Sequence, residues 1–545
     1  MNIEAADAGG RTDLIVREVV EQARHGNHAR AYELANAALG NGVRHPTLFN
    51  VRAVWYGREQ RYEEALSDFE SARAYFPRDA ALLDSIGHCL TMLARLREAV
   101  AAFDAAIAVR PEFVQAHYRR GAALGLLNDV EEMRQAHERV VALNPDHADA
   151  LASLAFIAAR AGDYAVARAY GLRATARLPH PPIALVALAI ADMGDGDFAA
   201  AKQRLEKVVA DARSDDGRLN MALGFAADAW DAHGCTSEAF AVYSALNNRR
   251  RNLHAARFCN ARAIDDVSRL VAYFEKNPSW ATLKAAPRDS EPAAVHVFLL
   301  GFVRSGTTLL ETVLASHPQV TASDERDFLA DAAHAFLDRD EDLDRLAVLE
   351  DVELDVWRDA YWKSVRESGA SAGCRVFVDK VPLNSLRLPL IAQLFPAARV
   401  LLALRDPRDV VFSTFRHRFN MSPTSFEFLQ LEDCARYYAA VMRFVAQSRQ
   451  ELPLHVLEHR YEDMIADFDG AIRRVCEFIG LEWIEAMRDF TNAAQTIDRQ
   501  SQSASQVRRG LYRGAIAQWR RYKDYLAPAM PILEPWIDRF GYFRE

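Results

Sequence analysis

The stretch VHVFLLGFVRSGTTLLETVLASHP, residues 295–318, contains an apolar run, a turn bounded by glycines and then the spacing of a helix. This order predicts a buried strand, a tight loop over residues 301–306 and a helix that begins near Thr307. Glycines let backbone amides approach a ligand closely, and a helix N-terminus favours an anion. The stretch therefore predicts a phosphate-binding loop. In the nucleotide-binding pattern GxxxxGK[ST] a lysine would occupy position 307, but here Thr307 stands there, and Arg304 is the nearest cation.

Three more runs of strand length follow the loop. They are VFVDK at 376–380, ARVLLALRD at 398–406 and LPLHVLEH at 452–459, and the segments between them have helical periodicity. Strands that alternate with helices predict a parallel sheet with crossover helices.

A second anion-binding position is predicted at the end of the third run. Arg405 leaves a strand end, and Ser413 lies in the first turns of the helix that follows. An arginine and a hydroxyl at the carboxyl edge of a parallel sheet would hold a phosphate separate from the one in the loop. The alternative is that Arg405 pairs with Asp406 or Asp409 on a solvated turn.

The first half of the chain contains an internal repeat over residues 47–180. Prolines recur every 34 residues, and so does a series of small residues where two helices would cross: Pro77, Pro111, Pro145 and Pro179, and Ala53, Gly87, Gly121, Ala155 and Ala189. The spacing resembles a tetratricopeptide array, a solenoid of helical hairpins with a concave binding face. The repeat weakens on both sides, toward Ala31 and beyond Leu205. His137 and Gly171 replace aromatic residues, so less regular packing is expected there.

Length and composition indicate the broad class of protein. At 545 residues, half of them hydrophobic, two domains are expected. The polar, proline-containing stretch 276–293 indicates the boundary, so we predict a helical solenoid over residues 1–285 and a second domain over 290–545. A net charge of −9 disfavours nucleic acid as a partner. The sequence shows no signal-peptide pattern and no apolar run of about 20 residues, which favours a cytoplasmic protein without a membrane span. The six scattered cysteines are expected to be reduced.

Four motifs occur in order in the second half: RSGTT at 304–308, DKVPLN at 379–384, RDPRD at 405–409 with a serine soon after, and SASQVR at 503–508 followed by WRRY. This set resembles the sulfotransferase family, in particular bacterial sulfotransferases with N-terminal tetratricopeptide repeats, and is similar to protein-tyrosine sulfotransferases. The resemblance covers residues 293–530 and the repeats. It implies an all-α tetratricopeptide solenoid followed by an α/β P-loop-like domain with a central parallel sheet.

The resemblance implies that the donor co-substrate is 3′-phosphoadenosine 5′-phosphosulfate (PAPS). The 5′ end would be held by the loop residues Arg304, Ser305, Gly306, Thr307 and Thr308, and the 3′-phosphate by Arg405 and Ser413, with Arg508 also reaching it. Tyr461 would stack on adenine, and Ser503 would contact the 5′ side. No metal is expected, because the donor already carries an activated group.

The catalytic roles implied by the resemblance fall on Glu325, Lys380, Arg304 and Ser503. Lys380 would lie at the bridging oxygen, where negative charge grows as the bond to sulfur breaks. Glu325 would be the general base, although the family usually has glycines where TASDE at 321–325 has Ala322 and Asp324. Asp324 is therefore the rival base. The alternatives give these residues no catalytic role. Lys380 would then be a surface lysine paired to Asp379, and the carboxylates of Asp324 and Glu325 would lie on the first turn of an exposed helix.

The sequence thus predicts a PAPS-dependent sulfotransferase acting on an acceptor hydroxyl, with a protein or peptide tyrosine as the first candidate. Two alternatives stay open: a P-loop-type kinase, which Thr307 disfavours, and a catalytically silent nucleotide-binding scaffold. The repeats are expected either to recognise a peptide, protein or glycan acceptor or to act as a scaffold, for example in a homodimer.

Overall fold

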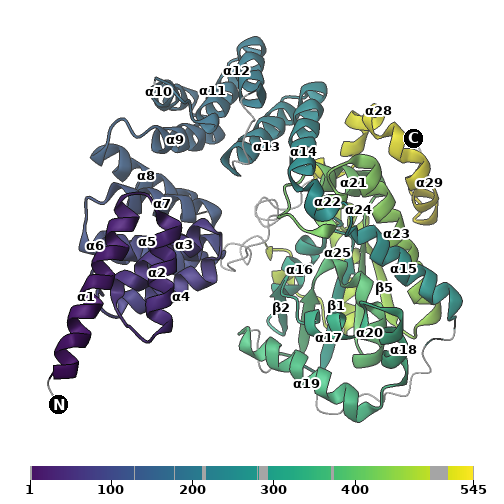
Figure 1. The fold of residues 1–545 in the computed structure, drawn as a ribbon. Helices are drawn as coiled ribbons and strands as arrows, with labels where there is room; N and C mark the ends of the chain where they lie inside the picture. The colour runs from purple at the N-terminus through teal and green to yellow at the C-terminus, as the bar shows by residue number, and fades with distance from the viewer. Residues whose placement is uncertain are drawn as a thin grey trace. The chain divides into compact units, whose positions relative to one another are not determined.

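The computed structural model describes residues 3–127, 129–176, 178–210, 217–278, 280, 293–369, 374–490 and 513–543. The chain forms two compact units, Met1–Ala229 and Trp230–Glu545 (Figure 1). Unit 1 is helical, and unit 2 holds the sheet.

Unit 1 is built from antiparallel helices that follow one another along the chain, and the last of them, α13, extends into unit 2. Their bounds are α1 Ile3–Arg24, α2 His28–Gly40, α3 Pro46–Arg58, α4 Tyr62–Arg73, α5 Ala80–Met92, α6 Leu96–Val109, α7 Val114–Leu126, α8 Val130–Leu143, α9 Ala148–Ala161, α10 Tyr164–Ala174, α11 Pro182–Gly194, α12 Phe198–Ala210 and α13 Gly217–Ala232. The helices α3 to α12 pair as hairpins, with each of the repeated prolines shortly after a helix end. The predicted repeat solenoid is confirmed.

The small residues of the repeat lie where the helices touch. A Cβ atom at Gly87 would lie 2.6 Å from the ring of Phe103, and one at Gly121 would lie 2.8 Å from the ring of His137. His137 is buried, so its imidazole fills the place of the expected aromatic side chain. Burial lowers its pKa to about 4, which keeps the ring neutral in this apolar contact.

The last two helices of the N-terminal half belong to unit 2. They are α14 (Thr236–Phe258) and α15 (Ala263–Lys276), and α15 packs along α23 (Leu431–Glu451). The compact units therefore divide at residues 229 and 230, whereas the boundary predicted from sequence, between 285 and 290, lies outside the described residues. The change in composition lies after α14 and α15, because these two helices have a composition like that of the repeats before them.

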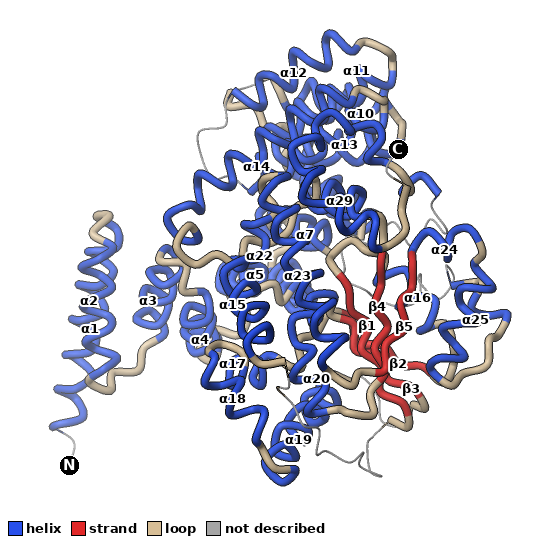
Figure 2. Tube along the Cα trace, turned by 90° about the vertical axis from the view of Figure 1, so that its right-hand side faces the viewer, coloured by secondary structure: helices blue, strands red, loops and turns tan. Residues whose placement is uncertain are grey.

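Unit 2 contains a five-stranded parallel sheet in the order β2-β3-β1-β4-β5 (Figure 2). The strands are β1 Val295–Gly301, β2 Val320–Asp324, β3 Val376–Lys380, β4 Arg399–Leu404 and β5 His455–Arg460. The four predicted strands are confirmed. The sequence did not predict β2, because VTASD is short and mostly polar. The alternative that the carboxylates at Asp324 and Glu325 begin an exposed helix is wrong. Asp324 ends β2, and the next helix begins only at Ala330.

Helices cover both faces of the sheet. The remaining elements are α16 Thr307–Ala315, α17 Ala330–Phe336, α18 Asp340–Val348, α19 Asp351–Glu367, η1 Pro382–Arg387, α20 Leu388–Leu394, α21 Pro407–Phe415, α22 Pro423–Glu427, α24 Tyr461–Ala466, α25 Phe468–Ile479, η2 Glu485–Met487, η3 Arg513–Ala515, η4 Gln518–Tyr522, α28 Lys523–Leu526, η5 Ala527–Ala529 and α29 Met530–Arg539. Val376 and Val378 pack toward α16 and α25, whereas Phe377 between them packs against Trp362 of α19. Successive residues of β3 therefore face opposite sides.

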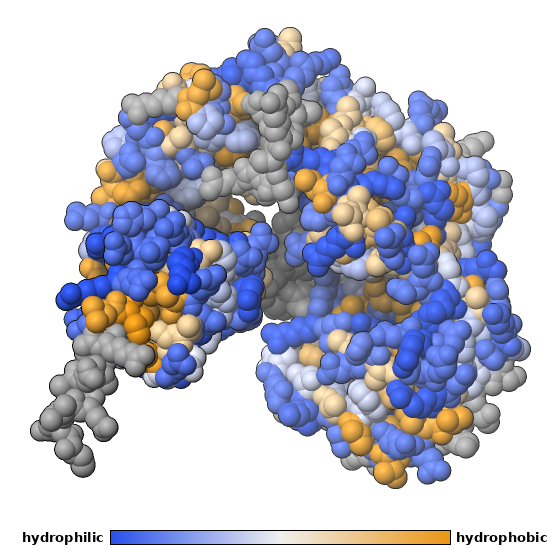
Figure 3. Space-filling model, viewed as in Figure 1, coloured by the Kyte–Doolittle hydropathy of each residue, from blue (hydrophilic) through white to orange (hydrophobic). Residues whose placement is uncertain are grey.

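On the face seen in Figure 3, hydrophobic residues occur in small groups among hydrophilic ones. At the end of α18 and in α19 the hydrophobic residues Val348, Val352 and Val356 are exposed. Within the described ranges, no helix has the length and apolarity needed to cross a membrane. The described histidines, cysteines and carboxylates form no group of three or more suited to a metal ion.

Candidate active site

The loop between β1 and α16 is held in a tight turn by two glycines. A Cβ atom at Gly301 (φ 154°) would lie 2.6 Å from the carbonyl oxygen of Ala403, and one at Gly306 (φ 94°) would lie 2.6 Å from the ring of Tyr461. Arg304 also has a positive φ, of 69°. These conformations suit glycine and are rare for other residues, so the fold holds the loop in an unusual shape.

The helix that follows begins at Thr307, as predicted, and has no side-chain cap. Thr307 and Thr308 are buried in its first turn. The first N–H groups of a helix have no partner inside it, and they form the positive end of the helix dipole. This helix start is therefore suited to an anion.

A cluster of arginines surrounds the loop. The Nε of Arg304 donates a hydrogen bond to the Oγ of Ser413 at 3.2 Å, and Arg405 donates to the carbonyl oxygens of Arg304 at 3.1 Å and Ala515 at 2.6 Å. Burial, the larger cause, and the charges of Arg405 and Arg416, the smaller one, together lower the pKa of Arg304 to about 9. The positive charges therefore repel one another in a partly dehydrated position, where an anion would relieve the repulsion.

One donor of this cluster has no hydrogen-bond partner among the described residues. The Nε of Arg405 is buried, and the whole side chain is 7% exposed. Because a buried N–H without an acceptor is costly, this atom favours a ligand with an acceptor oxygen. The guanidinium also lies over the ring of Tyr461, with 5.2 Å between its Cζ and the ring centroid.

The two acidic residues beside Arg405 have other partners. Asp406 forms a two-pronged pair with Arg408, at 2.9 and 2.7 Å. Asp409 accepts the backbone N–H groups of Ala517 at 2.7 Å and Trp519 at 2.9 Å, while its closest approach to Arg405 is 3.9 Å. Arg405 and Asp409 thus form a long ion pair, but both side chains are buried, so this turn is not the solvated one of the alternative.

Lys380 and Glu325 meet, although 55 residues separate them in sequence. The Nζ of Lys380 donates to the Oε1 of Glu325 at 2.7 Å and lies 3.1 Å from the Oε2 of Glu311. The lysine side chain is completely buried. It is therefore not a surface lysine, and its neighbour Asp379 faces the other side of the sheet, where its Oδ2 accepts a hydrogen bond from Tyr361 at 2.8 Å.

The two candidate bases follow one another at the end of β2. Asp324 is the last residue of the strand and is paired in register with Lys380. Its side chain lies outside the described part of the structure. Glu325 comes next, with a φ of 45°, and its side chain is 47% exposed. Glu325 thus combines contact with the buried lysine and access to solvent, which a base that meets an acceptor requires.

The structure brings most of the predicted residues together at the carboxyl ends of β1, β3 and β4. Ser503 and Arg508 lie outside the described residues, so their predicted roles stay predictions. Tyr461 lies against Gly306 and Arg405; its stacking on adenine also stays a prediction.

Sequence reasoning missed three residues of this site. Glu311 is a lone charge in the apolar helix TTLLETVLA, which could have marked it. Ser385 uses its hydroxyl to bridge the N–H and the carbonyl of Gly301, at 3.2 and 2.8 Å, and so holds the end of β1. Arg416 contributes to the positive field around Arg304, and it had no motif to identify it.

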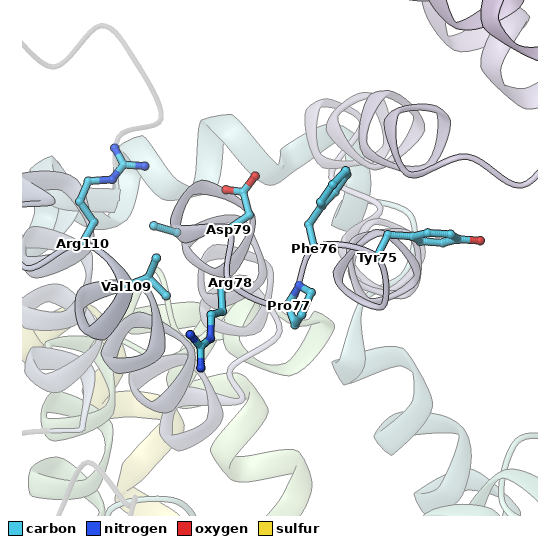
Figure 4. Close-up of a pocket in the computed structure, with 8 residues that line it drawn as sticks. Tyr75, Phe76, Pro77, Arg78, Asp79, Val109 and Arg110 are labelled. Carbon is cyan, nitrogen blue, oxygen red and sulfur yellow. The ribbon is translucent and has the colours of Figure 1, made fainter.

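A separate surface hollow of about 620 Å³ lies in unit 1 (Figure 4). Tyr75 and Phe76 lie on one side of Asp79, and Val109 and Arg110 lie on the other. The carboxylate of Asp79 accepts N–H groups from the first turn of α5 and so has a structural role. The hollow contains none of the predicted catalytic residues.

Comparison with known proteins supports the resemblance. Residues 296–485 match the model of the sulfotransferase family. A 253-residue segment is 27% identical to a protein of Aquifex aeolicus, covering 45% of this chain and 33% of that protein. A 256-residue segment is 23% identical to protein-tyrosine sulfotransferase A of Caenorhabditis elegans, covering 45% of this chain and 67% of that enzyme.

A shorter segment of 138 residues is 29% identical to the omega-hydroxy-beta-dihydromenaquinone-9 sulfotransferase Stf3 of Mycobacterium bovis, covering 24% of this chain and 34% of that enzyme. The chain thus spans from a third to two thirds of the length of these relatives. The family match contains the loop, Glu325, Lys380 and the arginine cluster. Residues 296–485 are therefore similar to the sulfotransferase family, and the chain joins this segment to an array of tetratricopeptide-like helical hairpins.

Proposed function

We propose that the protein transfers a sulfuryl group from PAPS to an acceptor hydroxyl. The observation that carries the proposal is the buried cluster of Arg304 and Arg405 beside the uncapped start of α16, with Lys380 at the end of a neighbouring strand. PAPS has a phosphosulfate and a separate 3′-phosphate, so its two anionic groups suit two adjoining cationic positions. The family match and the sulfotransferases among the relatives support the same reaction class.

In this proposal the loop residues 304–308 bind the 5′-phosphosulfate, and Arg405 with Ser413 binds the 3′-phosphate. The Nε of Arg405 supplies a donor that has no protein acceptor among the described residues. Tyr461, Ser503 and Arg508 complete the donor site in the roles that the resemblance implies. Because Arg304 reaches the Oγ of Ser413 at 3.2 Å, the two phosphate positions adjoin.

The proposed reaction needs one proton acceptor and one cation. The acceptor oxygen attacks sulfur and forms the new S–O bond, while its proton moves to the carboxylate of Glu325. The bond between sulfur and the 5′-phosphate oxygen breaks, and its electron pair stays on that oxygen, which leaves as part of 3′,5′-diphosphoadenosine. The ammonium of Lys380 stabilises the charge on this oxygen. We choose Glu325 as the base, because its carboxylate contacts Lys380 and is exposed; Asp324 is the alternative.

For the acceptor we propose a tyrosine hydroxyl in a peptide or protein. The similarity to protein-tyrosine sulfotransferase A supports this choice. The repeat array adds support, since such arrays bind peptides on a concave surface.

The test uses the full chain, with labelled PAPS to measure transfer and 3′,5′-diphosphoadenosine to measure binding. We expect calorimetry to show binding of the diphosphate, and label to pass to a tyrosine peptide in preference to a glycan or a lipid alcohol. Arg405→Met should weaken binding by about tenfold or more, because it removes a charged hydrogen bond worth about 1.5–3 kcal/mol. Arg443→Met is the matched control, because Arg443 is 65% exposed in a surface pair with Glu275.

Two results would contradict the proposal. One is a protein that neither binds the diphosphate nor transfers label to any acceptor. The other is magnesium-dependent phosphate transfer from ATP, which would favour a kinase. Label on the glycan or lipid alcohol alone would reject the tyrosine acceptor and leave the reaction class in place.

A further inference from the structure

Among the described side chains, two carboxylates from different elements lie beside the ammonium of Lys380. Glu325 follows β2 and approaches Lys380 to 2.7 Å, and Glu311 projects from the second turn of α16 and approaches it to 3.1 Å. The two carboxylates differ in exposure: the side chain of Glu311 is 1% exposed, and that of Glu325 is 47% exposed. Of these two described counterions of the lysine, one is therefore buried and the other exposed.

This difference in exposure gives the two carboxylates different roles beside Lys380. A buried ammonium is costly unless a charge stays beside it. Glu325 can turn toward solvent or an acceptor, so its contact with Lys380 can be exchanged. Glu311 is held in place because Leu310, Val313 and Leu314 around it in α16 are buried in the core of unit 2.

We infer that Glu311 is a positioning residue of the transfer site: it is the permanent counterion of Lys380, whereas Glu325 is the exchangeable one. This inference rests on the proposed function. When Glu325 takes the acceptor's proton it becomes neutral and no longer attracts the ammonium. Glu311 then keeps Lys380 charged and directed at the site while charge grows on the leaving oxygen.

The position of Glu311 also connects two parts of the site. It lies one turn after Thr307 and Thr308, whose N–H groups begin the helix. A helix is stiff over two turns, so α16 fixes the distance between the anion-binding helix start and the lysine.

The first test measures stability and needs no activity. Glu311→Gln and Glu325→Gln remove the same charge from the same lysine with little change of shape. We expect Glu311→Gln to lower the thermal midpoint by about 5 °C or more, since removing one partner from a buried pair is strongly destabilising. Glu325→Gln should lower it by about 2 °C or less, because its carboxylate is half exposed.

The coupling to the lysine is tested by adding Lys380→Met to each variant. Glu311→Gln with Lys380→Met should recover much of the loss seen in Glu311→Gln alone, because the uncompensated ammonium is gone. Equal midpoints for the two single variants, or a loss that Lys380→Met does not change, would overturn the inference.

The second test separates positioning from donor binding. With labelled PAPS and the acceptor that the wild type uses, Glu311→Gln should lower kcat by roughly tenfold to a hundredfold. This loss is smaller than the loss of roughly a hundredfold to a thousandfold that is expected when a contact to the transition state is removed. Its affinity for 3′,5′-diphosphoadenosine should change by less than about threefold, and Glu311→Asp should restore part of kcat.

The two proposals fail in different ways. An unchanged kcat in Glu311→Gln, or a loss of diphosphate affinity equal to the loss of kcat, would contradict the positioning role. A wild type without diphosphate binding or transfer would instead contradict the proposed function, and the stability cycle would still decide whether Glu311 is the permanent counterion.

Discussion

Replacing Asp379 by asparagine should stabilise the protein at neutral and alkaline pH. The carboxyl is completely buried, and burial raises its pKa to about 7 from the usual 3.8. The hydrogen bond from Tyr361 acts in the opposite direction but is the smaller effect. Asparagine keeps an acceptor for the Tyr361 hydroxyl and has no charge to bury.

The size of the effect follows from the difference between the two pKa values. At about 1.4 kcal/mol for each pH unit, the interval from 3.8 to about 7 corresponds to about 4 kcal/mol of unfolding free energy. Because the folded state binds the proton more tightly, this stability is complete below pH 3.8 and is lost as the pH rises to about 7. The advantage of Asp379→Asn over the wild type should therefore grow across this window and level off above it.

Urea unfolding followed by tryptophan fluorescence, at several pH values between 5 and 8, measures this advantage. His296, which contacts Tyr361 at 2.9 Å, should not contribute, because burial lowers its pKa to about 3. Asp409→Asn is the matched control. Asp409 is also buried with its pKa raised to about 6, but it accepts two N–H groups, so an amide with one acceptor oxygen should destabilise the protein. Parallel curves for the wild type and Asp379→Asn would refute the reasoning.

Three further outcomes are expected. Lys380→Met should lower transfer by roughly a hundredfold to a thousandfold in the labelled-PAPS assay, because it removes the cation at the leaving oxygen; near-normal transfer would exclude that role. Gly306→Ala should lower the thermal midpoint and weaken diphosphate binding, since the added Cβ would lie 2.6 Å from the Tyr461 ring at a φ of 94°; calorimetry identical to the wild type would argue against a rigid loop. Ser413→Ala should weaken diphosphate binding by about threefold to tenfold, as expected for one lost hydrogen bond, and an equal loss for adenosine 5′-phosphate, which has no 3′-phosphate, would contradict its assignment.

Local patterns in the sequence were sufficient for much of this molecule. The 34-residue repeat identified the hairpins of unit 1, and the apolar runs identified β1, β3, β4 and β5. The loop motif gave the start of α16 at Thr307. Each of these depends on the spacing of neighbouring residues, which a sequence displays directly.

Contacts between distant segments were not predictable in the same way. The strand β2 has only one large apolar residue, Val320, and its pairing with β3 decides where Glu325 lies. Glu311 contacts Lys380 across 69 positions, and nothing local in either segment indicates that the two meet. The placement of α14 and α15 in unit 2 depends on packing against α23, whereas their composition is that of the repeats.

The division of the chain at Trp230 has a practical consequence for anyone who wishes to isolate the transferase part. Asn247 donates a hydrogen bond from α14 to the carbonyl oxygen of Phe415 at 2.7 Å, at the end of the helix that carries Ser413. Phe274 of α15 packs against Phe444 of α23, with 5.7 Å between the ring centroids. A fragment that starts at residue 290 would lack both helices and expose these surfaces to water. Proteolysis or recombinant expression should therefore give a well-behaved fragment only when the cut falls before α14.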